Sequence, residues 1–318
     1  MENEQKTKRW RYGVNRWLII GLIVLGFILT GIFTPLRPHI QLPAERLSQQ
    51  PIFGDVYLTN TLVATAIVDI LLILTVIAVW RAMKTGSLVP SGFSGVIEGL
   101  IEIIHNLTEA TAGKWTKVIF PFFAAITMLV LVANWMELIP GVDSIGIFDP
   151  HHLDHPEDCE VIHITENIVY VEGDHHCSSA IVPFVRVAST DLNFTIGLAL
   201  VSVFMTQVIG VRALGISYFT KFINVKTIFS KPFFGLIDFV VGLFELVSEL
   251  SKIISFSFRL FGNIFAGSVL LFVIGTLLSM FQFGVLLMEM FIGMIQAIVF
   301  GMLTMVFMAQ ATQSHDEH

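Results

Sequence analysis

Charged side chains are scarce in this chain, and their scarcity excludes a soluble globular protein. Only 14% of the 318 residues are charged, whereas 54% are hydrophobic, and the mean hydropathy is +0.78. Soluble domains carry about 25% charged residues. The composition therefore predicts an integral membrane protein.

Other absences narrow the function. The net charge is −7 and the sequence has no basic stripe, which argues against nucleic-acid binding. It has no Gly-Lys-Ser/Thr phosphate loop, so we expect no nucleotide site and no cofactor. The lack of a His-Glu-x-x-His motif disfavours an intramembrane enzyme, and the lack of a clear internal repeat disfavours a self-contained transporter. Two cysteines are too few for a disulfide framework.

The apolar runs that are present predict about six membrane segments. The first, at 17–33, follows a basic N-terminus and is either a retained helix or a signal sequence. Between the second and third runs, over 92–109, apolar residues recur at intervals of three and four, which predicts an amphipathic helix on the membrane surface. Its Glu98, Glu102 and His105 are typical of a solvated helix face. The remaining five runs are 58–80, 118–139, 192–211, 236–280 and 283–309.

Basic residues cluster at alternate ends of these runs and predict cytoplasmic N- and C-termini. The loop between the third and fourth runs is rich in acidic residues and histidines and has no Lys or Arg before Arg186, so we place it outside. We divide the chain into an N-terminal extension with one candidate span, a part with two spans and the surface helix, the acidic His-rich loop, and a channel domain, at 1–56, 57–141, 142–190 and 191–318.

The outer loop contains ligand types that zinc prefers, but at spacings that match no regular zinc pattern. Its weak metal candidates are His151, His155, Cys159 and Cys177. A solvated acidic loop, a disulfide between Cys159 and Cys177, and a metal site all remain open.

Arg259 lies near the middle of the run at 236–280, where a guanidinium costs about 2.5–3.5 kcal/mol to insert. Such a residue indicates an ion path, although a structural ion pair is the alternative. Because arginine keeps its proton in proteins, it can supply only a fixed charge. Another group must carry the ion.

Polar residues in the last two runs repeat at helical spacing. Glu245, Glu249, Lys252, Arg259 and Asn263 fall near one face of the first run. A helix over 236–280 would be about 65 Å long, more than twice the apolar core of a bilayer, so it must tilt or bend. The part at 245–252 could instead be an interfacial salt-bridged patch.

The last run carries its polar residues at multiples of seven. Glu289 is the titratable candidate there, with Gln282 and Gln296 one heptad to either side. These side chains could also serve only as hydrogen bonds between helices. Two long helices with polar stripes predict a polar seam between them and a partner.

The segment 255–267, with the sequence SFSFRLFGNIFAG, resembles the signature of the membrane-sector a subunit of rotary ATP synthases. The stretches 134–141, 189–195 and 296–300 resemble three other parts of that family. The likeness covers about residues 57–318 except the outer loop. It implies an all-α polytopic membrane protein whose two long tilted helices line a partner ring, with one amphipathic surface helix.

The resemblance also implies roles for single residues. Arg259 would face a ring of c subunits, with Asn263 and Gln296 near it, and Glu289 would be the main proton relay on the outer side. Family members often place a carboxylate or histidine where this chain has Ser268, which leaves a relay with two titratable groups in question.

Two further positions would line the opening of the outer half-channel, namely Gln282 and Asn134. Glu245 would belong to the cytoplasmic half-channel. In the implied mechanism, a proton passes Glu289, neutralises a ring carboxylate, travels with the ring and leaves where Arg259 favours the ionised carboxylate. The subunit itself would not be an enzyme.

The resemblance finally implies partners and a location. The partners would be the c-subunit ring, the peripheral-stalk b subunits, the rest of the ATP synthase and the lipid bilayer. The location would be the cell inner membrane. Whether the coupling ion is H⁺ or Na⁺ depends on the ring, which would bind it.

Overall fold

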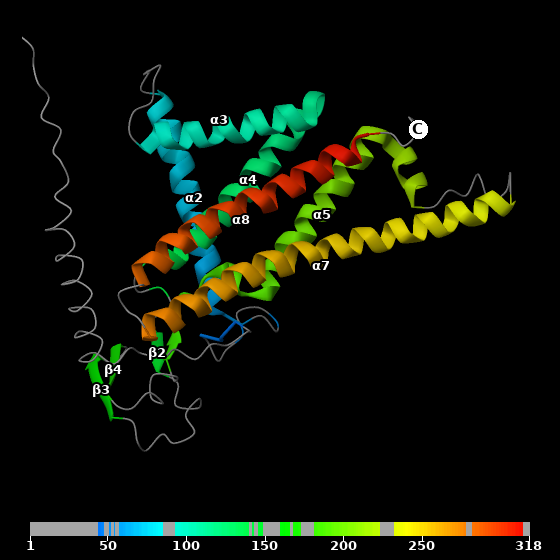
Figure 1. Ribbon diagram of the computed structural model, residues 1–318. Helices are drawn as coiled ribbons and strands as arrows, with labels where there is room; N and C mark the ends of the chain where they lie inside the picture. Colours follow the sequence, from blue (N-terminus) through cyan, green and yellow to red (C-terminus); the bar gives the residue numbers. More distant parts are fainter. Residues whose placement is uncertain are drawn as a thin grey trace, which may run out of the picture.

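The computed structural model describes residues 44–47, 51, 54, 57–84, 93–139, 142, 146–148, 160–165, 168–172, 181–222, 232–277 and 282–313 (Figure 1). Within these ranges, five helical stretches are long and apolar enough to cross a membrane. The all-α polytopic fold predicted from the sequence is confirmed. The sixth candidate segment, at 17–33, lies outside the described residues.

The first described span is α2, Asn60–Lys84, whose last turn carries Arg81 and Lys84. It leads to α3, Phe93–Ala112, which is the amphipathic helix predicted over 92–109. Its Ile104 is buried, whereas Glu98, Glu102 and His105 are exposed together with the apolar Val96 and Ile103.

After α3 the chain reverses through the short helix η1, Gly113–Trp115, where Gly113 has a positive φ of 51°. The next span, α4, covers Thr116–Trp135 and ends in η2, Met136–Leu138. The predicted third run extended to residue 139. Its last residues form η2 instead, and this turn places Glu137 beside the long helices.

The fourth span, α5, covers Leu192–Leu214 and follows η6, Ala188–Thr190. The Asp191 carboxylate caps its start by accepting a hydrogen bond from the Asn193 backbone N–H at 2.9 Å. Gly215, with a φ of 63°, ends it and begins η7, Gly215–Lys221.

The two long runs form α7, Pro232–Leu277, and α8, Gln282–Ala311. Pro232 is the first residue of α7, a position where its missing N–H is harmless. With 46 residues, α7 is about 70 Å long, against an apolar bilayer core of about 30 Å. Figure 1 shows α7 and α8 running alongside each other and obliquely to α2.

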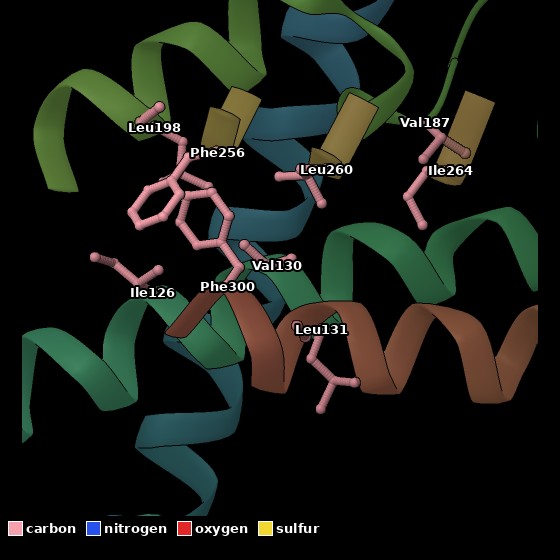
Figure 2. Packing of buried hydrophobic residues seen from close by; sticks show 11 residues of the cluster. Ile126, Val130, Leu131, Val187, Leu198, Phe256, Leu260, Ile264 and Phe300 are labelled. Carbon is pink, nitrogen blue, oxygen red and sulfur yellow. The ribbon is translucent and has the colours of Figure 1, made fainter. Parts of the chain in front are cut away.

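The apolar core lies where α4, α5, α7 and α8 meet. The rings of Phe256 on α7 and Phe300 on α8 lie 5.4 Å apart, centroid to centroid, with Leu198, Ile126 and Val130 around them (Figure 2). This core fixes the two long helices against each other, so their polar residues hold a defined register.

The loop between α4 and α5 adds four short strands that the sequence did not predict. The strands β2, Gly146–Phe148, and β5, Ile181–Pro183, pair antiparallel. The strands β3, Glu160–Thr165, and β4, Ile168–Glu172, form a second antiparallel pair with an irregularity between His163 and Thr165. In Figure 1 these strands lie at the end of the molecule opposite α3.

Candidate functional site

The sequence predicts a polar seam between the two long helices and a partner, and the polar residues of this seam lie along α7 and α8. Arg259 is exposed on α7, and its guanidinium donates a long hydrogen bond of 3.4 Å to the Ser255 hydroxyl one turn earlier. Within the described part of the chain, this is the one partner of its side chain. Among the described residues, no carboxylate pairs with Arg259, as the alternative of a structural ion pair would require.

One turn beyond Arg259, an amide pair joins the two long helices. Asn263 donates from Nδ2 to Oε1 of Gln296 at 2.7 Å. Gln296 is only 3% exposed, and among the described residues its Nε2 group has no hydrogen-bond partner. A buried N–H without a partner is costly, so this amide group retains the capacity to donate a further hydrogen bond.

Glu289 lies two turns before Gln296 on α8 and is 4% exposed. Neither of its carboxylate oxygens has a hydrogen-bond partner within the described part of the chain. The carboxylate lies against Gly267 of α7, where an added Cβ would collide with it. Gly267 is about 12 Å along the α7 axis from Arg259, toward the end that carries the strands (Figure 1).

Ser268, next to Gly267, is bonded to a carboxylate that sequence reasoning missed. Its hydroxyl donates to Oε1 of Glu137 at 2.6 Å and to the Ile264 carbonyl at 3.1 Å. Glu137 belongs to η2, within the segment 134–141 that carries the resemblance. A second acidic group thus stands beside the position where this chain has serine.

Asn134 is 3% exposed and is engaged through both ends of its amide. Its oxygen accepts from the Ser189 hydroxyl at 2.7 Å, and its nitrogen donates to the Gly293 carbonyl of α8 at 3.1 Å. Beside it, Trp135 donates from Nε1 to the Met290 carbonyl at 3.1 Å. The structure gives Asn134 a helix-packing role next to Glu289, whatever it contributes to a channel opening.

The other predicted positions lie farther from this seam. Gln282 is the first residue of α8, seven residues before Glu289. Glu245 is half-buried on α7, about 21 Å along the axis from Arg259 and on the side away from the strands. The weak metal candidates His151, His155, Cys159 and Cys177 all lie outside the described residues.

The fold and this seam define a polytopic membrane subunit with a buried acidic group and an exposed arginine along two long helices. The sequence profile of the family described as ATP synthase A chain matches residues 62–309. The chain therefore belongs to the ATP synthase A chain family, the proton-translocating stator component of the membrane sector. It is a channel subunit of the ATP synthase complex.

Curated relatives agree with this assignment. The ATP synthase subunit a of Marinomonas sp. is 30% identical over 239 residues, covering 74% of this chain and 76% of its own length. That of Teredinibacter turnerae is 28% identical, with coverages of 74% and 73%. The subunit a of Mycobacterium tuberculosis is 26% identical, with coverages of 82% and 89%.

Proposed function

We propose that this chain provides two offset half-channels to a ring of c subunits and so couples proton flow to rotation and ATP synthesis. The proposal is supported by the surroundings of two groups on the long helices, one acidic and buried, the other basic and exposed. Glu289 is buried without a partner, whereas Arg259 is exposed without a counter-charge among the described residues.

The acidic groups near the strands would form the outer half-channel. Glu289 takes up the proton, and Glu137, held by Ser268, stands next in line as a second titratable group. A carboxyl can both accept and donate a proton, and the Ser268 hydroxyl holds the Glu137 carboxylate in place by its hydrogen bond. Gln282 would lie toward the outer opening, on the N-terminal side of Glu289.

Arg259 would meet the ring carboxylate after the amide pair Asn263–Gln296. A fixed positive charge favours the ionised carboxylate, so the proton leaves on the cytoplasmic side rather than returning. The same charge repels protons that would otherwise run directly between the two half-channels. Glu245 would stand on the cytoplasmic path, as expected for an acidic group on the opposite side of Arg259.

The charge distribution supports an orientation in the cell inner membrane. Arg81, Lys84 and Arg212 lie in the last turns of α2 and α5, and Lys114 lies in η1. These ends would face the cytoplasm by the positive-inside rule. The strand-bearing loop would then lie outside and both termini inside.

The test is ATP-driven proton pumping by the whole complex in inverted membrane vesicles, followed with a pH-sensitive dye. Arg259→Ala should abolish pumping while the complex still assembles. Purified complex should contain a ring of small c subunits and the peripheral-stalk b subunits. Normal pumping by Arg259→Ala, or a complex without the ring, would overturn the proposed function.

A further inference from the structure

A second cation lies on the same helix as Arg259, and it is neutralised. Lys252 and Arg259 are the two basic residues in the sequence of α7. They are seven residues apart, so they project from nearly the same face about 10.5 Å apart along the axis. Unless it is compensated, Lys252 would be a second positive charge in line with Arg259.

The surroundings of the two cations differ sharply. The Lys252 ammonium donates to Oε1 of Glu249 at 2.8 Å and lies 4.5 Å from the ring centroid of Phe307 on α8. The lysine side chain is 19% exposed and the glutamate side chain 10%. Arg259 is exposed and contacts only the neutral Ser255 hydroxyl within the described residues.

Neighbouring elements hold the Glu249 carboxylate in place. Gln207 of α5 donates from Nε2 to its other oxygen at 3.1 Å. Tyr218 of η7 is 3% exposed, and its hydroxyl donates to Oε1 of Gln207 at 2.7 Å. Because the amide oxygen is occupied by Tyr218, the amide N–H group faces the carboxylate. Both oxygens of Glu249 are thereby fixed, with one directed at Lys252.

We propose that Glu249 is a positioning residue that neutralises Lys252, so that ring carboxylates meet one uncompensated cation on α7. A ring carboxylate passing two free cations would be attracted to each in turn. The second attraction would hold the ring at a wrong angle and slow rotation. This inference rests on the proposed role of Arg259 as the fixed charge that faces the ring.

The experiment compares three variants of the whole complex in inverted vesicles, with ATP-driven pumping as the readout. Glu249→Gln leaves Lys252 without its counter-charge, so that a ring carboxylate is attracted to it as well as to Arg259. Pumping should fall about tenfold, which corresponds to about 1.4 kcal/mol of added attraction. The double variant Glu249→Gln with Lys252→Gln removes both charges together and should restore pumping to at least half of the wild-type rate. Lys252→Gln alone is the matched single control.

A merely structural pair would act through the amount of assembled complex, and removing both partners would relieve that loss as well. Pumping is therefore divided by the amount of assembled complex in the same membranes, and a loss in Glu249→Gln that vanishes on this division overturns the inference. A double variant as slow as Glu249→Gln also overturns the inference, as does wild-type pumping by Glu249→Gln. Should Glu249→Gln fail to accumulate in membranes, the double variant decides alone: pumping at half the wild-type rate or more supports compensation, and background pumping overturns it. Arg259→Ala in the same assay tests the proposed function separately, since its failure to abolish pumping would sink that proposal regardless of Glu249.

Discussion

Gly267 gives the most direct test of the proposed proton relay at Glu289. The three atoms nearest to a Cβ added at this glycine all belong to the Glu289 carboxyl group, with its carbon at 2.5 Å and its Oε1 at 2.7 Å. Ordinary contacts between such atoms begin near about 3.5 Å. The substitution Gly267→Ala must therefore move the carboxyl group by about 1 Å.

This movement should change the free energy of unfolding little and the pumping rate strongly. The Glu289 carboxyl is the far end of a flexible side chain, so a strained rotamer costs about 0.5–1.5 kcal/mol. Replacing a helical glycine by alanine returns about 0.5–1 kcal/mol. Stability should thus change little. A displacement of about 1 Å at a reacting group can lower a rate about a hundredfold, and we expect a pumping loss of tenfold to a hundredfold on that scale.

The assay is ATP-driven pumping in inverted vesicles, with the amount of assembled complex measured in the same membranes. Gly197→Ala is the matched control, because a Cβ at this exposed α5 position meets nothing within 4 Å. Equal pumping by Gly267→Ala and Gly197→Ala, at equal assembly, would show that the position of the Glu289 carboxylate does not govern proton uptake.

Three further expectations concern the outer side. Glu289→Gln should lower pumping about a hundredfold, as loss of a positioned proton-transfer group does, and a wild-type rate would make Glu289 structural. Glu137→Gln should cost about tenfold, because one charge-assisted hydrogen bond is weakened; an unchanged rate would leave the outer relay with one titratable group. Thiol titration with and without reductant should distinguish a bridged Cys159–Cys177 pair, reactive only after reduction, from two free thiols that react in both conditions.

The two long helices and much of their seam were predictable because helical spacing is local. The spacing of seven between Glu289 and Gln296 puts both on one face of α8, and the spacing of four between Arg259 and Asn263 does the same on α7. The structure brings these faces together in the bond between Asn263 and Gln296. Neither spacing could predict that Asn263 pairs with Gln296, since this pairing depends on how the two helices pack.

The contacts of the candidate site that join residues distant in sequence could not be predicted. Glu137 and Ser268 are 131 residues apart, and the turn that brings them together ends the third span earlier than its hydropathy suggested. From the sequence, the polar residues at 245–252 could be either an interfacial salt-bridged patch or part of a functional seam. Its Glu249–Lys252 pair is a salt bridge, partly buried against Gln207 of α5 and Phe307 of α8, and no pattern within α7 could reveal these neighbours.

The two hydrogen bonds that join the end of α4 to α8 have a mechanical consequence. Trp135 and Asn134 hold the backbone carbonyls of Met290 and Gly293, one helical turn apart, by hydrogen bonds of 3.1 Å each. In the proposed function, the ring that rotates past this chain exerts a sideways force on the helices that line it. For α8 to slide along its axis, both hydrogen bonds must break, and the membrane interior offers little water to form new ones with the freed carbonyls. In the proposed function, the end of α4 would therefore keep α8, and with it Glu289, at a fixed height beside α7.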